Sequence, residues 1–334
     1  MRLLPLVYHN LHGQGVRDPL MARLRGVYRR VWCENHRLFH AAAPVIERLA
    51  ANGCELLLLK GAPLVLSYYR NHALRPMADI DLVVRGHQLQ AAMAVLLGQG
   101  YRSARAVTSD LLRFMHAVPF VHPDGGQIDL HWHVLFEAAD EPADREFWAA
   151  TEAAEFMGTP VRQPNPTSLL LQVIVHGVRS NEETPIRWIP DALTILRTRS
   201  DAIDWYRLLD FAGAYRLTYR LALGLRYLAG TFQAPIPAFV LSALGRRQSL
   251  LERVENTVML ADSGRFSQSV LGTHWVSFTE YCRYARRGGP LAFLNGYTEY
   301  LRFRLNLDGR RELVPFLVRS LGRKLRSGAD HRVL

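Results

Sequence analysis

The chain has 334 residues, of which 49% are hydrophobic, and its formal net charge is +11. No apolar stretch approaches the ~20 residues that a membrane-spanning helix needs, and the first residues are too polar to predict a signal peptide. The three cysteines are too widely spaced to predict a disulfide framework or a zinc site, so we expect a cytoplasmic protein without a transmembrane segment.

The positive charge comes almost entirely from arginine, because Lys60 and Lys324 are the only lysines. A genome that favours arginine codons accounts for the bias, and against it a lysine in a turn stands out. The compact ammonium of Lys60 suits a position that faces phosphate. The charge is spread along the chain, which favours a nucleoside triphosphate over a nucleic acid as the anionic partner.

The first 53 residues are expected to be helical. Apolar residues recur at helical spacing over 16–32 and again over 34–51, and Asn52-Gly53 is typical of a helix end. We therefore predict two helices in an N-terminal segment 1–53.

A strand, a turn and a helix follow in residues 54–66. The run Leu56–Leu59 predicts a short buried strand, and Lys60-Gly61 predicts a turn. Pro63 suits the first turn of a helix, where its missing N–H would have no partner in any case. The only lysine of this region therefore lies between the strand and the helix.

Two aspartates mark a second strand, at residues 80–84. Side chains alternate along a strand, so Asp79 and Asp81 point to one face, while Ile80 and Leu82 point into a core. Two carboxylates this close repel each other, and each loses solvation beside apolar residues. Either an exposed edge strand solvates them, or a divalent cation such as Mg²⁺, which prefers oxygen ligands, compensates their charge.

A hairpin is expected further on. Residues 116–121 and 127–134 predict two strands joined by a Pro-Asp-Gly-Gly turn. Period two places Asp129, His131 and His133 on one face of the second strand. Asp129 is a candidate third carboxylate for the metal. His131 is expected to bind phosphate, orient Asp129, act as a base or be structural, and His133 is expected to be structural.

The remainder of the chain predicts mainly helices. Residues 143–158 predict a helix and a connecting segment, and two prolines in 161–166 predict a domain boundary. Helical periodicity then recurs over 166–178, 188–198, 203–212, 215–229, 237–244 and 250–260. The basic, amphipathic tail 302–334 predicts either a partner or membrane-surface helix or the solvated face of a last core helix.

Several motifs together resemble the uncharacterised nucleotidyltransferase family of the polymerase-beta superfamily. The resemblance runs from about residue 40 to about residue 200, and it is carried by Leu59-Lys60-Gly61, Tyr68-Tyr69, Arg75 and Asp79-Ile80-Asp81-Leu82-Val83-Val84. Many superfamily members have Gly-Ser at the turn where this chain has Lys60-Gly61. His176, Arg187, Trp188 and Asp191 match a second, helical region of the family, in which we expect His176 and Asp191 to form a buried packing contact or, alternatively, to take part in catalysis.

The resemblance implies an α+β fold. We expect a small mixed-sheet nucleotidyltransferase domain with flanking helices at 54–160, followed by a mostly α-helical C-terminal domain at 161–334. It also implies an enzyme that moves a nucleoside monophosphate from a nucleoside triphosphate, such as ATP, to a hydroxyl acceptor. The acceptor stays open between a small molecule, a protein and RNA.

The resemblance also assigns roles to residues. Two Mg²⁺ ions and the catalytic step are expected on three carboxylates, and the nucleotide on four further residues: Asp79, Asp81 and Asp129 for metal and catalysis, and Lys60, Gly61, Arg75 and His131 for the nucleotide. The alternative is a non-catalytic nucleotide-binding or scaffold module whose site has degenerated.

Overall fold

The computed structural model describes residues 2–178, 186–250, 252–254, 275, 277–282 and 290–316. The chain divides into two compact units. The first comprises residues 1–107 and 116–252, and the second comprises residues 108–115 and 253–334.

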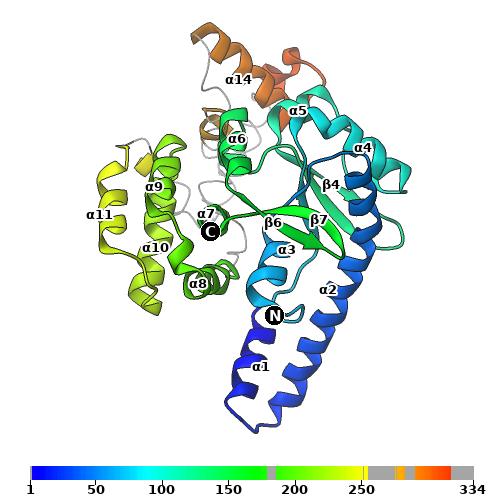
Figure 1. Ribbon diagram of the computed structural model, residues 1–334. Coiled ribbons are helices and arrows are strands. Elements are labelled where there is room, and N and C mark those ends of the chain that lie inside the picture. Colours follow the sequence, from blue (N-terminus) through cyan, green and yellow to red (C-terminus); the bar gives the residue numbers. More distant parts are fainter. Residues whose placement is uncertain are drawn as a thin grey trace, which may run out of the picture. The chain divides into compact units, whose positions relative to one another are not determined.

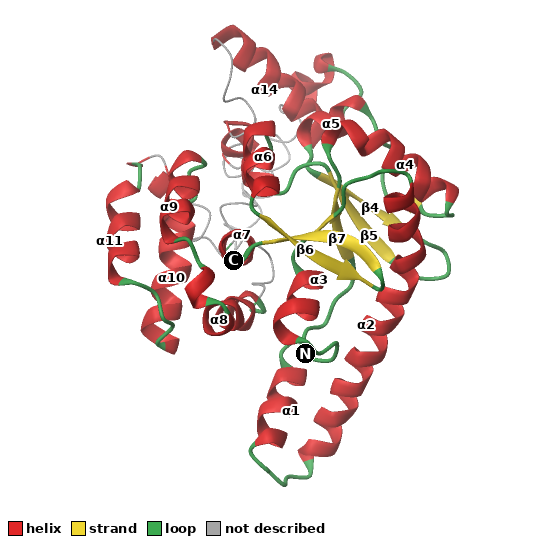
Figure 2. Ribbon diagram, viewed as in Figure 1, coloured by secondary structure: helices red, strands yellow, loops and turns green. Residues whose placement is uncertain are grey.

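The first unit is built on a mixed sheet of seven strands in the order β3-β4-β5-β2-β1-β7-β6, drawn in yellow in Figure 2. The pairs β2/β5 and β1/β7 are parallel, and the other neighbours are antiparallel. The strands are β1 (Leu57–Leu58), β2 (Ile80–Val83), β3 (Arg102–Ser103), β4 (Ala117–Val121), β5 (Gln127–His131), β6 (Thr151–Phe156) and β7 (Thr159–Pro164).

The central strands are apolar because both faces of the sheet are covered. Leu57, Leu58, Ile80 and Leu82 are completely buried. Helix α2 (Leu20–Ala51) contacts β2, β5 and β7, and α4 (Leu89–Gly98) packs against α2. The short α3 (Gly61–Pro63) and the π-helix Leu64–Tyr69 follow β1 directly, so the predicted strand, turn and helix are confirmed.

The prediction of two N-terminal helices over 16–32 and 34–51 is wrong, since α2 continues through residue 33 as one helix. Its first half lies beside α1 (Leu4–Gly13) and its second half covers the sheet (Figure 1). The apolar stripe of α2 therefore packs against α1 in its first half and against the sheet in its second half. In the sequence, this change of partner resembled a break between two helices. Pro44 lies inside the helix without ending it.

Residues 161–166, where two prolines predicted a boundary, belong largely to β7, so they form a strand of the sheet and not a connecting segment. Prolines lack the N–H that a strand interior uses. Here Pro160 and Pro164 stand near the two ends of β7, and the pairing of β7 with β1 is centred between them, where Arg162 N donates to Leu56 O. Residues 150–158, expected as a connection, supply β6.

Helices follow the sheet in the first unit, as predicted. Helix α6 (Glu141–Ala149) lies between β5 and β6 in the chain, and the helices after β7 are α7 (Pro166–Gly177), α8 (Trp188–Thr198), α9 (Trp205–Ala214), α10 (Thr218–Phe232) and α11 (Ala238–Arg247). Helix α7 contacts β7, α8, α9 and α10, so it joins the sheet to the other helices. Its buried residues share one core with Leu57, Leu59 and Val83 of the sheet. The mixed sheet with its flanking and following helices confirms the expected α+β fold.

The second unit contains α5 (Ser109–Phe114) and α14 (Pro290–Arg304). Phe114, Tyr281 and Tyr300 form its small aromatic core. Arg302 pairs with Asp110 and with Glu299. Most of the helix predicted at 250–260 and the end of the basic tail, from residue 317, lie outside the described residues.

No helix in the described part of the chain is both long and apolar enough to cross a membrane. The three proposed domains, 1–53, 54–160 and 161–334, stay a prediction.

Candidate functional site

Two predicted carboxylates stand side by side on neighbouring strands. Asp81 of β2 and Asp129 of β5 are direct partners in the parallel register. His131 pairs with Val83 two positions further on, so all three polar side chains share the face of the sheet that looks toward α7. This face is otherwise apolar, so the cluster needs compensation for its charge.

Lys60 supplies part of that compensation. Its Nζ donates to Asp81 Oδ1 at 2.5 Å, and Asp81 is only 4% exposed. The backbone of Lys60 has φ 49° and ψ −105°, a strained conformation for a residue with a side chain. Its N–H donates to Gln172 Oε1 of α7 at 3.1 Å. Lys60 is therefore held both by its backbone N–H and by its side-chain ammonium, and the turn directs the ammonium to Asp81.

His131 connects the two carboxylates. Its Nε2 lies 3.2 Å from Asp81 Oδ1 and 3.0 Å from Asp129 Oδ2. Both partners are acceptors, so Nε2 carries the proton and donates. The Nδ1 atom is buried without a hydrogen-bond partner, and the ring packs edge-on against His116. This geometry suits a histidine that orients carboxylates.

The donor set fits a hard cation. Possible ligand atoms of Asp81, Asp129 and His131 all lie within 4.8 Å of one another, but His131 Nε2 carries a proton, so the two aspartates are the candidate ligands of this group. Among the described residues, Asp81 Oδ2 and Asp129 Oδ1 accept no hydrogen bond, and Asp79, just before β2, accepts none. Unpaired carboxylate oxygens at this density are what Mg²⁺ prefers as ligands. Asp79 is not a member of the compact group, so its part in a metal site stays a prediction.

The electrostatics follow from burial and from these pairs. Burial and the nearby Asp81 raise the pKa of Asp79. Burial alone would raise the pKa of Asp81, but Lys60 and His131 reverse this and hold it well below its usual range. Burial works to lower the pKa values of Lys60 and His131, yet the neighbouring aspartates outweigh it and raise both.

A cavity of about 280 Å³ opens beside this cluster, between the sheet edge and helices α7 and α8. Five predicted site residues line it: Lys60, Gly61, Arg75, Asp79 and Asp81. The helices add Gln172, Val173, His176, Gly177, Arg187, Trp188 and Asp191, and Met77 and Ala78 complete the lining. Asp129 and His131 adjoin Asp81 but do not line the cavity.

Arg75 is fixed by a residue far away in the sequence. Its Nε lies 3.2 Å and 3.0 Å from the two oxygens of Asp191, and Tyr69 OH donates to the same carboxylate at 2.9 Å. A Cβ on Gly61 would lie 2.5 Å from Arg75 Nη1, so glycine allows the guanidinium to lie over the turn. The expected contact between His176 and Asp191 stays a prediction.

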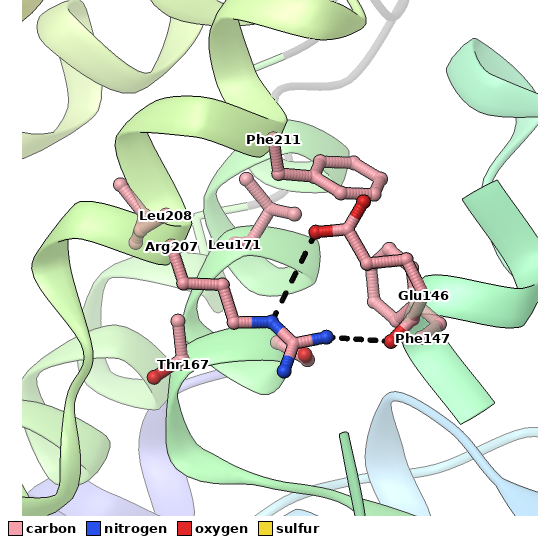
Figure 3. A pocket seen from close by; sticks show the side chains of 8 residues that line it. Glu146, Phe147, Thr167, Leu171, Arg207, Leu208 and Phe211 are labelled. Carbon is pink, nitrogen blue, oxygen red and sulfur yellow. Dashed lines mark hydrogen bonds and ion pairs between the residues drawn. The ribbon is translucent and has the colours of Figure 1, made fainter. Parts of the chain in front are cut away.

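A second, smaller cavity is a packing gap between helices. Figure 3 shows it between α6, α7 and α9, with Arg207 reaching Glu146: Arg207 Nη2 donates to Glu146 O at 2.6 Å, and Nε lies 3.9 Å from Glu146 Oε1. Its volume of about 10 Å³ holds at most about one water. No residue predicted for the site lines it, so we assign it no ligand.

The structure adds residues that the sequence-based site prediction omitted. Gln172, Arg187 and Asp191 all face the large cavity, and Tyr69 holds Asp191. The sequence had pointed to two of them, because Arg187 and Asp191 match the second, helical region of the family. His133, predicted as structural, has its Nδ1 2.6 Å from Asp144 Oδ2.

The comparison with protein families defines the class of protein. The model of a family described as uncharacterised nucleotidyltransferase matches residues 1–233, and the chain belongs to this family. The expected family is thereby confirmed, and the chain is an enzyme of the nucleotidyltransferase kind. No curated protein matches the chain.

Two solved structures are similar at low identity. The antibiotic-resistance factor ANT(2'')-Ia is 16% identical, with a TM-score of 0.39, over 58% of this chain and 98% of its own. An antigenic nucleotidyltransferase-like protein from Paracoccidioides brasiliensis is 14% identical, with a TM-score of 0.40, over 62% of this chain and 97% of its own.

Proposed function

We propose that the chain is a metal-dependent nucleotidyltransferase that moves a nucleoside monophosphate from a nucleoside triphosphate to a hydroxyl acceptor and releases pyrophosphate. One observation carries the proposal. Asp81 and Asp129 stand as register partners with unpaired oxygens, next to a cavity that also contains Lys60 and Arg75. A cluster of carboxylates beside cationic groups suits a metal-bound phosphate chain.

The cations would bind the phosphates. Lys60 lies at the turn before α3, where its ammonium pairs with Asp81 at the cavity, and Gly61 lets the backbone come close to a ligand. The Nη1 and Nη2 atoms of Arg75 donate to no acceptor within the described residues. This leaves the planar edge of its guanidinium available to phosphate oxygens.

The carboxylates would hold Mg²⁺, with two ions expected, on Asp79, Asp81 and Asp129. When bound, the metal supplies charge neutralisation of the phosphates and acidifies the acceptor hydroxyl. Asp129 is the most exposed of the compact group, with 21% of its side chain accessible, and in this proposal it or a water accepts the hydroxyl proton. His131 keeps both carboxylates oriented through Nε2. In-line attack then breaks the bond between the α-phosphorus and the bridging oxygen of pyrophosphate.

The acceptor is proposed only as a hydroxyl group of a small molecule, a protein or RNA. The cavity volume and the mixture of Trp188, Val173 and charged groups leave room for one nucleotide rather than for a folded macromolecule. A large acceptor would therefore present its hydroxyl at the cavity mouth.

Two labels test the reaction type. The protein is incubated with Mg²⁺ and each nucleoside triphosphate, labelled at either the α- or the γ-phosphate, in a fractionated cell extract. Nucleotidyl transfer moves the α-label to an acceptor fraction and releases the γ-label as pyrophosphate. Transfer of the γ-label to an acceptor would contradict the proposal, and retention of bound nucleotide without any transfer would favour a non-catalytic binding module.

A further inference from the structure

Helix α8 brings a second guanidinium to the cavity. Arg187 precedes α8 directly, and it lines the same space as Arg75 and Lys60. Its Nη1 donates to Pro76 O at 2.5 Å, which anchors the side chain to the segment just before Asp79. Within the described residues, its Nε and Nη2 have no acceptor.

The two arginines are held in different ways. Arg75 is fixed through Nε by Asp191, and Asp191 in turn by Tyr69, so the free edge of Arg75 consists of Nη1 and Nη2. Arg75 and Asp191 expose only 13% and 5% of their side chains. The rotamer of Arg75 is therefore set by the protein before any ligand arrives, which lowers the entropic cost of binding.

Arg75 and Arg187 repel each other across one cavity, and a bound anion would offset this repulsion. Burial and the neighbouring Arg75 lower the pKa of Arg187. Asp191 is already engaged with Arg75, and Asp79 and Asp81 lie on the sheet side of the cavity. Within the described residues, the guanidinium edges thus carry unused hydrogen-bond donors at the cavity, as does the buried Nε2 atom of Gln172. Bidentate phosphate recognition uses the planar edges of guanidinium groups.

We propose that Arg187 and Arg75 together form a clamp for the terminal diphosphate of a nucleoside triphosphate, with Asp191 as a positioning residue for Arg75. The site thus selects nucleoside triphosphates, and diphosphate chains generally, over monophosphates. This inference rests on the proposed function for its natural ligand, whereas the anion site itself is testable without any transfer reaction.

The binding of inorganic tripolyphosphate, measured calorimetrically without divalent metal, tests the clamp. Arg187→Ala should weaken binding roughly 10- to 100-fold, the loss that charge-assisted hydrogen bonds account for. Arg197→Ala is the matched control, since Arg197 lies in α8, is exposed, and its side chain takes part in no hydrogen bond in the described structure. Affinities of the Arg187→Ala and Arg197→Ala variants within twofold of each other would overturn the proposal.

Two further variants separate the clamp from a purely structural role. Arg187→Lys keeps the charge but lacks the planar fork of donors, so it should retain only part of the affinity. Asp191→Asn should weaken tripolyphosphate binding while orthophosphate binding changes little, because one phosphate needs only one guanidinium. An equal loss for both anions would contradict the positioning role.

The outcomes also distinguish this inference from the proposed function. Binding of tripolyphosphate that depends on Arg187, in a protein that transfers no label, supports the clamp and refutes the transfer reaction. Transfer with an unchanged KM for the nucleoside triphosphate in Arg187→Ala supports the reaction and refutes the clamp.

Discussion

Asp79 and Asp81 should respond in opposite ways to the same substitution in the metal-free protein. Asp81 pairs with Lys60 and His131, so Asp81→Asn removes the charge that compensates a buried ammonium. The Asp79 carboxylate accepts no hydrogen bond within the described residues and is repelled by Asp81, so Asp79→Asn removes a repulsion. We expect Asp81→Asn to destabilise the fold and Asp79→Asn to stabilise it.

The magnitude follows from the burial of the pair. Breaking a buried ion pair by removing one partner typically costs about 3–5 kcal/mol. Lys60 keeps 23% of its side chain exposed and Asp81 keeps 5%. Solvent screening therefore reduces the expected loss for Asp81→Asn to about 2–3 kcal/mol, a fall in Tm of roughly 4–12 °C. Asp79→Asn should raise Tm by roughly 1–4 °C.

The pH dependence of stability tests separately whether Asp79→Asn stabilises the fold. The raised pKa of Asp79 means that the native state binds more protons than the unfolded state between the two pKa values. Stability conferred by the protonated carboxyl is therefore lost as pH rises through the native pKa. The gain from Asp79→Asn should be absent at low pH and grow as the pH is raised toward neutrality.

Thermal unfolding with EDTA, followed by circular dichroism from pH 4 to 8, measures these effects. Asp201→Asn is the control, because Asp201 is exposed and pairs with nothing within the described residues. Shifts of Tm in the same direction for Asp79→Asn and Asp81→Asn would refute the electrostatic reasoning.

Two further predictions concern binding and rate. Gly61→Ala places a Cβ 2.5 Å from Arg75 Nη1, so we expect the affinity for nucleoside triphosphate to fall about tenfold, as measured by titration calorimetry. Gly98→Ala is the control, because a Cβ at Gly98 would meet open space. Equal affinities of the two variants would contradict the prediction. His131→Ala should lower the transfer rate by about 10- to 100-fold with little change in nucleotide affinity, since His131 orients both carboxylates. Single-turnover kinetics measure the rate, and an unchanged rate would remove His131 from the site.

The part of the site that follows strand alternation could be predicted from the sequence. Period two placed Ile80 and Leu82 in the core, and both are fully buried. The same rule placed Asp129 and His131 on one face, and their side chains are in contact. A pattern of two residues is local, so it survives without any knowledge of the partner strand.

Contacts that depend on the tertiary fold could not be predicted. Asp191 meets Arg75 across 116 positions of the sequence, and no local pattern specifies that partner. The strand β7 was missed because its prolines are typical of a boundary, and its pairing with β1 is visible only in the assembled sheet. The strained backbone of Lys60 is likewise held by contacts with Gln172 and Asp81, which lie 112 and 21 positions away in the sequence.

The most direct test of the central claim is the rate of α-label transfer from the nucleoside triphosphate to an acceptor fraction, compared between the unaltered protein and Asp129→Asn. The unaltered protein should transfer the label only with Mg²⁺. Asp129→Asn should reduce the rate by orders of magnitude while it stays folded and binds nucleotide, because the loss falls on the transition state. Transfer that is equally fast in Asp129→Asn, or that persists in EDTA, would contradict a metal-dependent reaction at this cluster of carboxylates.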